Sequence, residues 1–384
     1  MSREFLMPRR TVMGENAIEG AKKYFAEMGT RALIISGTVT SKSKCFEELK
    51  TALESAGIKT ACFTEIHGEP TDKTVNAALE VYRENGCDCL AAIGGGSALD
   101  TMKAAAVLAA KGGRIADYMG RLIEGSLPFM AAVPTTAGTG SEATRFTVIT
   151  DTATDIKMLL NGAPLIPDLA IIDPAYTVSS PKGITAATGL DALTHAIESY
   201  TSRKAQPLTD TVAISAVKRI FKHLPIAYKD GENLKAREEM SVAAFEAGVA
   251  INNASVTLVH GMSRPIGANF HVAHGISNAM LLEKCLSFAL DGAYERFADL
   301  ARAIGAADNS DDDKSAAELL IKAIGELCRL CEIPTLEEYG IPREKFFAVL
   351  DKMSADAVAS GSPANTVKAV TVDDVKEIYR GLWK

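Results

Sequence analysis

The chain has 384 residues, of which 47% are hydrophobic and 23% charged, a balance typical of a globular protein long enough for two domains. A net charge of −7 and the lack of any basic run argue against a nucleic-acid-binding surface. The clearest apolar stretch, residues 104–110, is far shorter than the roughly 20 residues that cross a membrane, so we expect no membrane partner.

Two further features bear on the compartment. Residues 1–5 lack the apolar run and the small-residue cleavage site of a secretion signal. The seven cysteines are odd in number and scattered, which does not favour a disulfide framework. We therefore expect a cytoplasmic protein.

The first half of the chain alternates short β-rich runs with helical patterns. Strand-like runs and helical windows in this order predict a parallel α/β sheet. The expected strands cover residues 31–36, 60–64, 89–93, 129–133 and 169–172, and the expected helices cover 46–56, 74–85 and 101–110.

The second half shows apolar residues three and four apart and no convincing strand. The helical windows are residues 209–221, 237–251, 293–304 and 316–330. Prolines at 174 and 181 interrupt any element between the two halves. We expect an α/β domain over residues 1–180 and an all-helical domain over residues 181–384.

Two loops rich in glycine and small hydroxyl residues each follow an expected strand. Residues 93–100 precede a helix, whose N-terminus can bind a diphosphate, but Leu99 occupies the third glycine position of the dinucleotide fingerprint. Residues 134–142 offer many donors and little bulk. Either loop alone could be an ordinary turn, but two at the ligand-binding edge of a sheet strengthen each other.

Histidines cluster in the helical half. Asp191 and His195 lie four residues apart, hence on one face of a helix, and His260 and His274 follow. Pro265 and Gly267 are expected to break the chain between these two histidines into helix, loop and helix. One carboxylate and three imidazoles suit a divalent ion such as iron or zinc, although an Asp/His pair can also be a plain polar face.

Four motifs in this order resemble those of the iron-containing (group III) alcohol dehydrogenases. The likeness is collinear and is clearest from Ile34 to Leu282. The motifs are residues 94–100, 134–142, 188–198 and 260–279.

The resemblance implies a dehydroquinate synthase-like fold, in which a Rossmann-like N-terminal domain binds the dinucleotide and an all-α C-terminal domain binds the metal, with the active site in the cleft between them. It implies a metal-dependent alcohol dehydrogenase or aldehyde reductase that transfers hydride between NAD(P)(H) and a small alcohol, aldehyde or ketone. The metal, usually Fe²⁺ with zinc or another divalent ion as alternatives, acts as a Lewis acid on the alcohol.

The same resemblance assigns residues to roles. The metal ligands are Asp191, His195, His260 and His274. Gly95, Gly96 and Ser97 cradle the diphosphate, Thr135, Thr136 and Thr139 line the nicotinamide half, Lys157 reaches its ribose, and Gly37, Asp100 and Ser141 complete the cofactor set.

Two positions depart from the family pattern. Arg264 stands where relatives often carry a second histidine that relays protons. We therefore expect His271 to take over the relay, which makes His271 and His260 the expected catalytic residues. Alternatively, Arg264 could pair with an acidic substrate group. Gly37 stands where many relatives place an aspartate that repels a 2′-phosphate, and Lys42 and Lys44 follow it. This favours NADP(H) over NAD(H), with NAD(H) still possible.

Alternatives are a related branch, such as a glycerol dehydrogenase or maleylacetate reductase, and a catalytically silent nucleotide- or metal-binding protein. The pattern of one aspartate and three histidines favours the alcohol dehydrogenases over branches with fewer ligand histidines. The resemblance also implies a homodimer or higher homo-oligomer, formed through the edge of the N-terminal domain.

Overall fold

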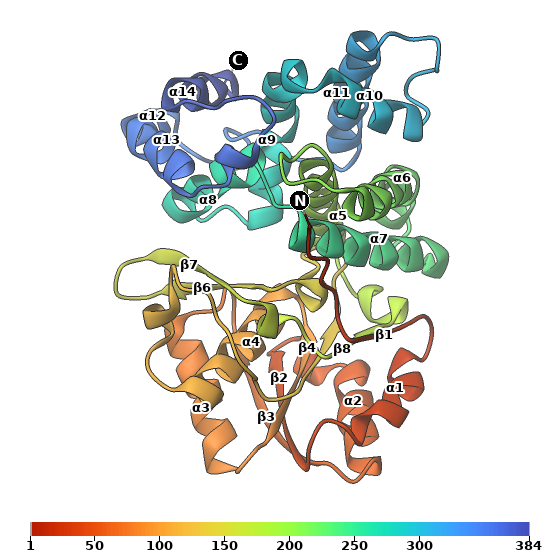
Figure 1. Cartoon of the computed structure of the whole chain (residues 1–384), viewed down its shortest axis with the longest axis vertical. Helices are drawn as coiled ribbons and strands as arrows, with labels where there is room; N and C mark the ends of the chain where they lie inside the picture. The colour runs from red at the N-terminus through yellow and green to blue at the C-terminus, as the bar shows by residue number, and fades with distance from the viewer. Residues whose placement is uncertain (1, 384) are drawn as a thin grey trace. The chain divides into compact units, whose positions relative to one another are not determined.

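The computed structural model describes residues 2–383, which form two compact units (Figure 1). One unit is Leu6–Ser180. The other combines the residues up to Phe5 with those from Pro181 onward.

The unit Leu6–Ser180 is built on a six-stranded sheet in the order β1-β8-β5-β4-β2-β3, and all of its pairings are parallel. The strands are β1 (Arg10–Met13), β2 (Arg31–Gly37), β3 (Lys59–Ile66), β4 (Cys89–Gly94), β5 (Met130–Pro134) and β8 (Leu169–Ile172). The five strands predicted from apolar runs are all present. The fold class, a parallel α/β unit and a helical unit, is confirmed.

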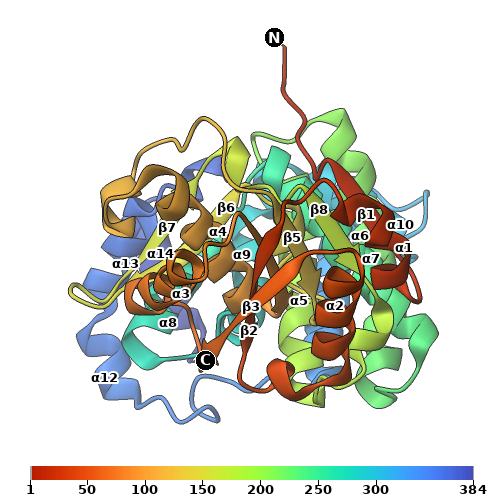
Figure 2. The same cartoon turned by 90° about the horizontal axis from the view of Figure 1, so that it is seen from below.

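Helices cover both faces of this sheet, which explains why its central strands are apolar on both sides. Helices α1 (Ala17–Phe25) and α2 (Lys44–Ser55) pack on one face, against side chains such as Ile34. Helices α3 (Asp72–Glu84) and α4 (Gly96–Lys111) cover the other, against Leu33 and Ile35 (Figure 2).

The strand order contains a switch point. Strand β2 pairs with β3 on one side and with β4 on the other, so the winding of the chain reverses between β2 and β4. Gly37 ends β2, and the loop before α4 follows β4, at the carboxyl ends of these two neighbours. Open α/β sheets bind ligands at such a point.

Some elements of this unit were not predicted. Besides β1 and α1, these are β6 (Phe146–Asp151) and β7 (Ile156–Asn161), which pair as an antiparallel hairpin. The hairpin buries only alternate residues, and β1 is short and only partly buried, so neither contains a continuous apolar run. Helix α4 also begins at Gly96, before the expected residue 101.

The second unit is helical, and its described residues contain no strand beyond an isolated bridge between Ser202 and Thr366. Helix α5 packs against α6, α7 and α9, which explains why it is buried on nearly every side. The helices are α5 (Lys182–Tyr200), α6 (Pro207–Lys229), α7 (Leu234–Asn253), α8 (Leu258–Phe270), α9 (His274–Ala289), α10 (Tyr294–Ala303), α11 (Asp313–Leu330), α12 (Arg343–Ala348), α13 (Leu350–Ala359) and α14 (Val372–Gly381).

The predicted arrangement of helix, loop and helix between His260 and His274 is present, but the break does not fall at Pro265 and Gly267. Helix α8 runs through both residues and ends at Phe270, and the residue that follows it, His271, has a φ of 54° in the left-handed region. Pro265 removes only one backbone donor, and burial of most of α8 outweighs that loss. The turn between His260 and His274 is therefore the short segment 271–273.

Among the described residues, no single helix is long and apolar enough to cross a membrane. Helices α7 and α8 satisfy this criterion only as a pair, and they are bent by 102° relative to each other.

Helix α9 begins very close to the backbone of α5. A Cβ atom added to Gly275 would lie 2.3 Å from the carbonyl oxygen of Ala187 and 2.8 Å from its carbonyl carbon. No side-chain adjustment relieves a clash with backbone. The glycine next to His274 thus sets the distance between the helix of His274 and the helix of Asp191.

We predict that Gly275→Ala destabilises the helical unit by about 1–3 kcal/mol, because α5 and α9 must separate. Chemical denaturation would measure this change. Gly183→Ala on α5 is the matched control, since no atom lies within 4 Å of its added Cβ, and it should be neutral or slightly stabilising. Equal free energies of unfolding for the two variants would contradict the close packing.

Candidate functional site

Three helices bring the four predicted metal ligands together. Helix α5 carries Asp191 and His195 one turn apart, α8 carries His260 in its first turn, and α9 begins at His274. Asp191, His195 and His260 are buried, whereas the side chain of His274 is 39% exposed. The Asp/His pair is therefore not a solvated polar face.

The ligand atoms converge on Asp191. Its Oδ1 atom lies 3.6 Å from Nε2 of His260, 3.8 Å from Nε2 of His274 and 3.9 Å from Nε2 of His195. Ligand atoms of Asp191, His195 and His260 all lie within 4.8 Å of one another. A tetrahedral ion with bonds of about 2.1 Å separates its ligand atoms by about 3.4 Å, so small side-chain shifts suffice for a metal.

The electrostatics of this cluster favour a bound cation. Burial alone raises the pKa of the Asp191 carboxyl. The facing imidazoles, of which His195 has the largest effect, nevertheless lower this pKa well below its usual range. Burial alone lowers the pKa of His260, whereas the carboxylates of Glu198 and Asp191 raise it to about 9. Two buried carboxylates thus stabilise positive charge here, whether a proton or a metal ion supplies it.

Glu198 fixes the orientation of His260. Its Oε2 lies 2.6 Å from Nδ1 of His260, and its Oε1 accepts hydrogen bonds from the Thr257 hydroxyl and the Val259 amide. The side chain of Glu198 is fully buried. A proton held on Nδ1 leaves the Nε2 lone pair directed at Asp191, the tautomer that a metal ligand requires.

Sequence reasoning gave Glu198 no role. The available signal was its position in α5, because Asp191, His195 and Glu198 follow one another at intervals of four and three residues. That spacing places all three on one face of the helix.

Asn278 also touches the cluster and was assigned no role. Its Nδ2 donates to Oδ1 of Asp191 at 2.7 Å and lies 3.2 Å and 3.3 Å from Nε2 of His260 and His274. Its Oδ1 is buried without a hydrogen-bond partner. A carboxylate and two imidazoles thus converge on one electropositive group, as they would on a cation.

His271 does not join this cluster. It is exposed at the end of α8, and in the described part of the chain its ring makes no hydrogen bond with the four ligand side chains.

In the α/β unit, the two loops rich in small residues lie against each other. A Cβ atom added to Gly96 would lie 2.9 Å from Cγ2 of Thr139, and one added to Gly95 would lie 3.6 Å from the side chain of Thr136. The amide of Thr135 donates to the carbonyl of Gly94. The structure therefore brings together the predicted residues of both loops, next to Ser97 in the first turn of α4.

Asp100 and Ser141, both predicted to bind the cofactor, are bonded to each other. The Ser141 hydroxyl donates to Oδ1 of Asp100 at 2.7 Å, and the Val148 amide donates to Oδ2 at 2.9 Å. Burial raises the pKa of Asp100, and the charge of Lys103 acts in the opposite direction. These contacts attach the loop of residues 134–142 to α4. Asp100 and Ser141 therefore hold this loop in place.

Lys103 reinforces the same attachment and was missed. Its fully buried ammonium donates to the carbonyls of Thr144 and Phe146, and burial lowers its pKa to about 8. Burial also raises the pKa of Glu142, in the same loop, to about 7. The signal was a lysine one turn after Asp100 within an otherwise apolar helix.

The remaining cofactor candidates are set apart from the two loops in sequence. Gly37 ends β2 at the switch point. Lys157 lies on β7, and its ammonium pairs with the Glu69 carboxylate at 2.6 Å. A ribose hydroxyl would therefore have to share this ammonium with Glu69.

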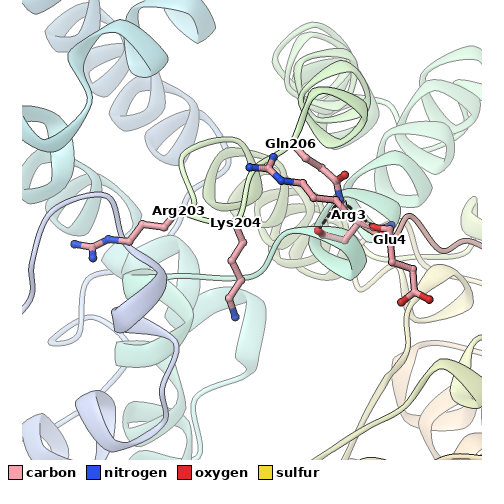
Figure 3. Close-up of a pocket in the computed structure, with 6 residues that line it drawn as sticks. Arg3, Glu4, Arg203, Lys204 and Gln206 are labelled. Carbon is pink, nitrogen blue, oxygen red and sulfur yellow. Dashed lines mark hydrogen bonds between the residues drawn. The ribbon is translucent and has the colours of Figure 1, made fainter. Parts of the chain in front are cut away.

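A separate hollow of about 370 Å³ in the helical unit contains none of the predicted site residues (Figure 3). Arg3 donates to the carbonyl of Ala205, and Arg203 donates to the carbonyls of Thr366 and Val367. Figure 3 shows the charged ends of Arg203 and Lys204 pointing away from Arg3. Because the cations that line this hollow do not converge on one point, it is no evident anion site. It is where the N-terminal residues dock, since Arg3 and Glu4 line it and Gln206 donates to the carbonyl of Glu4.

A parallel sheet covered by helices on both faces, with two small-residue loops, and a largely buried cluster of one carboxylate and three imidazoles are together typical of metal-dependent dehydrogenases that use a dinucleotide. Comparison with known proteins gives the same class. The family model "Iron-containing alcohol dehydrogenase" matches residues 8–174, and the model "Fe-containing alcohol dehydrogenase family, C-terminal" matches residues 185–383.

Individual relatives cover nearly the whole chain. The NAD-dependent methanol dehydrogenase of Bacillus methanolicus is 36% identical, and the 1,3-propanediol dehydrogenase of Citrobacter freundii is 35% identical, each over 98% of both chains. The solved structure of a 1,3-propanediol oxidoreductase superposes with a TM-score of 0.95 at 33% identity and covers 100% of both chains.

The chain belongs to the iron-containing alcohol dehydrogenase family. It is an oxidoreductase that uses a nicotinamide dinucleotide and acts on small-molecule alcohols or the corresponding carbonyl compounds. These matches favour the alcohol dehydrogenases over the glycerol dehydrogenase and maleylacetate reductase branches.

We predict that Glu198→Gln weakens metal binding about 10- to 100-fold, because a neutral amide holds the Nδ1 proton of His260 less firmly. Chelator competition would measure the affinity, and NMR of the histidine ring nitrogens would report the tautomer. Glu246→Gln is the control, since this acid of the same unit bonds to Ser215. Wild-type metal affinity in a folded Glu198→Gln protein would show that Glu198 does not orient His260.

Proposed function

We propose that Asp191, His195, His260 and His274 bind one divalent metal ion, ferrous iron by preference, with zinc or another divalent ion as a substitute. The support is the convergence of three imidazole nitrogens within 3.9 Å of one carboxylate oxygen. Neutral imidazoles and one carboxylate are donors that suit iron and zinc alike. When bound, such an ion supplies Lewis acidity that lowers the pKa of an alcohol.

The protein's own residues hold the reactants. Glu198 keeps His260 in the ligating tautomer, and Asn278 holds the Asp191 carboxylate in place. Gly95, Gly96 and Ser97 cradle the diphosphate on the N-terminus of α4, and Thr135, Thr136 and Thr139 line the nicotinamide half. His271, exposed to solvent, carries the proton to and from water.

We predict that metal-free protein reduces no aldehyde and that reloading with Fe²⁺ restores activity. The measurement is oxidation of reduced cofactor, with NADH and NADPH, across a panel of short aldehydes and ketones. His195→Ala should bind metal at least about 10-fold more weakly, because it removes one ligand. His223→Ala, on α6, is the control. Full activity in a protein shown to contain no metal would refute the proposal.

A preference for NADP(H) is the finer part of the proposal. It is supported by Gly37 at the end of β2 and by Lys42, which forms no ion pair with any described residue. Lys44 contributes less, because its ammonium already pairs with Glu48. The methanol dehydrogenase relative is named NAD-dependent, so the argument rests on this chain's own departure from the family pattern.

We predict that Gly37→Asp shifts the ratio of kcat/KM for NADPH over NADH downward by about 10- to 100-fold, because a carboxylate repels the 2′-phosphate and can bond the ribose hydroxyls. The aspartate fits, since the added Cβ meets only the Ile66 carbonyl, at 3.4 Å. Gly183→Asp adds the same charge on α5 and serves as the control. A wild-type preference for NADH would contradict the NADP(H) proposal.

Assembly and compartment complete the proposal. Strands β1 and β3 are the edges of the sheet, and an edge strand can pair with a second copy, which supports a homodimer. All seven cysteines are free, which suits a reducing cytoplasm. Sedimentation velocity would measure the oligomeric state.

A further inference from the structure

Arg264 lies one turn after His260 on α8. Residues four apart share a face of a helix, and their Cα atoms lie about 6 Å apart along its axis. Arg264 is the one residue between Leu258 and Gly267 that is not fully buried. The structure therefore places Arg264 on the same face of α8 as a proposed metal ligand, on a helix whose neighbouring residues are buried.

The charge of Arg264 has no partner of opposite sign. Its Nη1 donates to the hydroxyl of Ser362 at 3.0 Å, and none of the described carboxylates forms a salt bridge with it. A guanidinium has five donor hydrogens, so one neutral hydroxyl leaves most of its capacity unused. Burial lowers the pKa of Arg264, which shows that its surroundings penalise the charge.

Glu198, whose charge acts on Arg264, is not available to pair with it. Both of its oxygens are taken, by Thr257 and Val259 on one side and by His260 on the other.

Two other partly buried arginines of this unit have carboxylate partners. Arg296 pairs with Asp210 at 2.6 Å, and Arg302 pairs with Asp313 at 2.8 Å. A partly buried cation with no such partner is costly unless a ligand brings the anion. Arg264 thus differs from these two residues because no carboxylate of the described chain balances its charge, which leaves it able to bind an anionic ligand.

We propose that Arg264 binds an anionic group on the substrate, so that the alcohol or aldehyde is a short-chain acid bearing a carboxylate, sulfonate or phosphate. This inference rests on the proposed function, because the metal site positions the reacting end. The spacing of His260 and Arg264 suits an anion a few carbons from the reacting carbon. A planar guanidinium holds such an oxyanion through two parallel hydrogen bonds.

The redox chemistry is that of the family. The alcohol carbon loses a hydride to the oxidised nicotinamide, the hydroxyl proton passes to water, and the carbonyl product and reduced nicotinamide result. Arg264 exchanges no proton or electron and acts on substrate binding alone.

The test compares succinic semialdehyde with butanal, two aldehydes of equal carbon number of which only the first is charged. In the metal-loaded wild type, the charged aldehyde should have the higher kcat/KM. Arg264→Met should lower the ratio of the two kcat/KM values about 10- to 100-fold, mainly through the KM of the charged aldehyde. Arg264→Lys should fall between, because it keeps the charge and loses the planar fork.

Arg302→Met is the matched control, since it removes a partly buried guanidinium of the same unit that pairs with Asp313. Its ratio should equal that of the wild type. An unchanged ratio in folded Arg264→Met and Arg264→Lys proteins would overturn the inference. A raised KM for the nicotinamide cofactor, with no change for either aldehyde, would overturn it as well and assign Arg264 to a cofactor phosphate.

Calorimetric titration with succinate, which cannot be reduced, separates this inference from the proposed function. Succinate should bind the wild type about 10-fold or more tightly than Arg264→Met. If reloaded wild type reduces no aldehyde at all, the proposed function fails, yet the succinate titration still decides the role of Arg264. If reloaded wild type reduces butanal while succinate binds the wild type and Arg264→Met equally, the proposed function stands and the inference fails.

Discussion

The helical unit depends on one buried carboxylate. Asp191 lies in the interior of α5, where an isolated negative charge would cost several kcal/mol. The cost is offset because Asn278 donates to it and three imidazoles surround it. Helices α5, α8 and α9 must therefore approach closely, and Gly275 permits this at the α5–α9 contact.

Helix α4 of the α/β unit also carries charged side chains that are removed from water. Asp100 is partly buried and Lys103, one turn later, is fully buried. Both form their side-chain hydrogen bonds with the segment between Ser141 and Val148. Their bonds hold the second loop against the glycine turn that starts the same helix. In both units a buried charge on one helix thus fixes the position of groups from elsewhere in the chain.

The fold was predictable wherever burial leaves a continuous apolar run, as in residues 89–93 and 169–172. It was not predictable for the β6–β7 hairpin, in which buried residues alternate with less buried ones over only six positions per strand. Pro265 and Gly267 suggested a break in α8, but tertiary burial, which a local pattern does not contain, outweighed their low helix propensity. The metal candidates were predictable because four ligand-type residues stood at helical spacing or within recognisable motifs.

The chemistry of a residue type does not reveal whether its hydrogen-bonding capacity is already used. Asp100, Ser141 and Lys157 have suitable side chains for a cofactor site, yet each is bonded to another residue of the chain. Arg264 interrupts the expected pattern, yet its charge is the one left without a counter-ion beside the metal ligands. The three-dimensional structure is needed to show which hydrogen-bond and ion-pair partners each side chain already has. Those partners separate a residue that stabilises the protein from one that is able to bind a ligand.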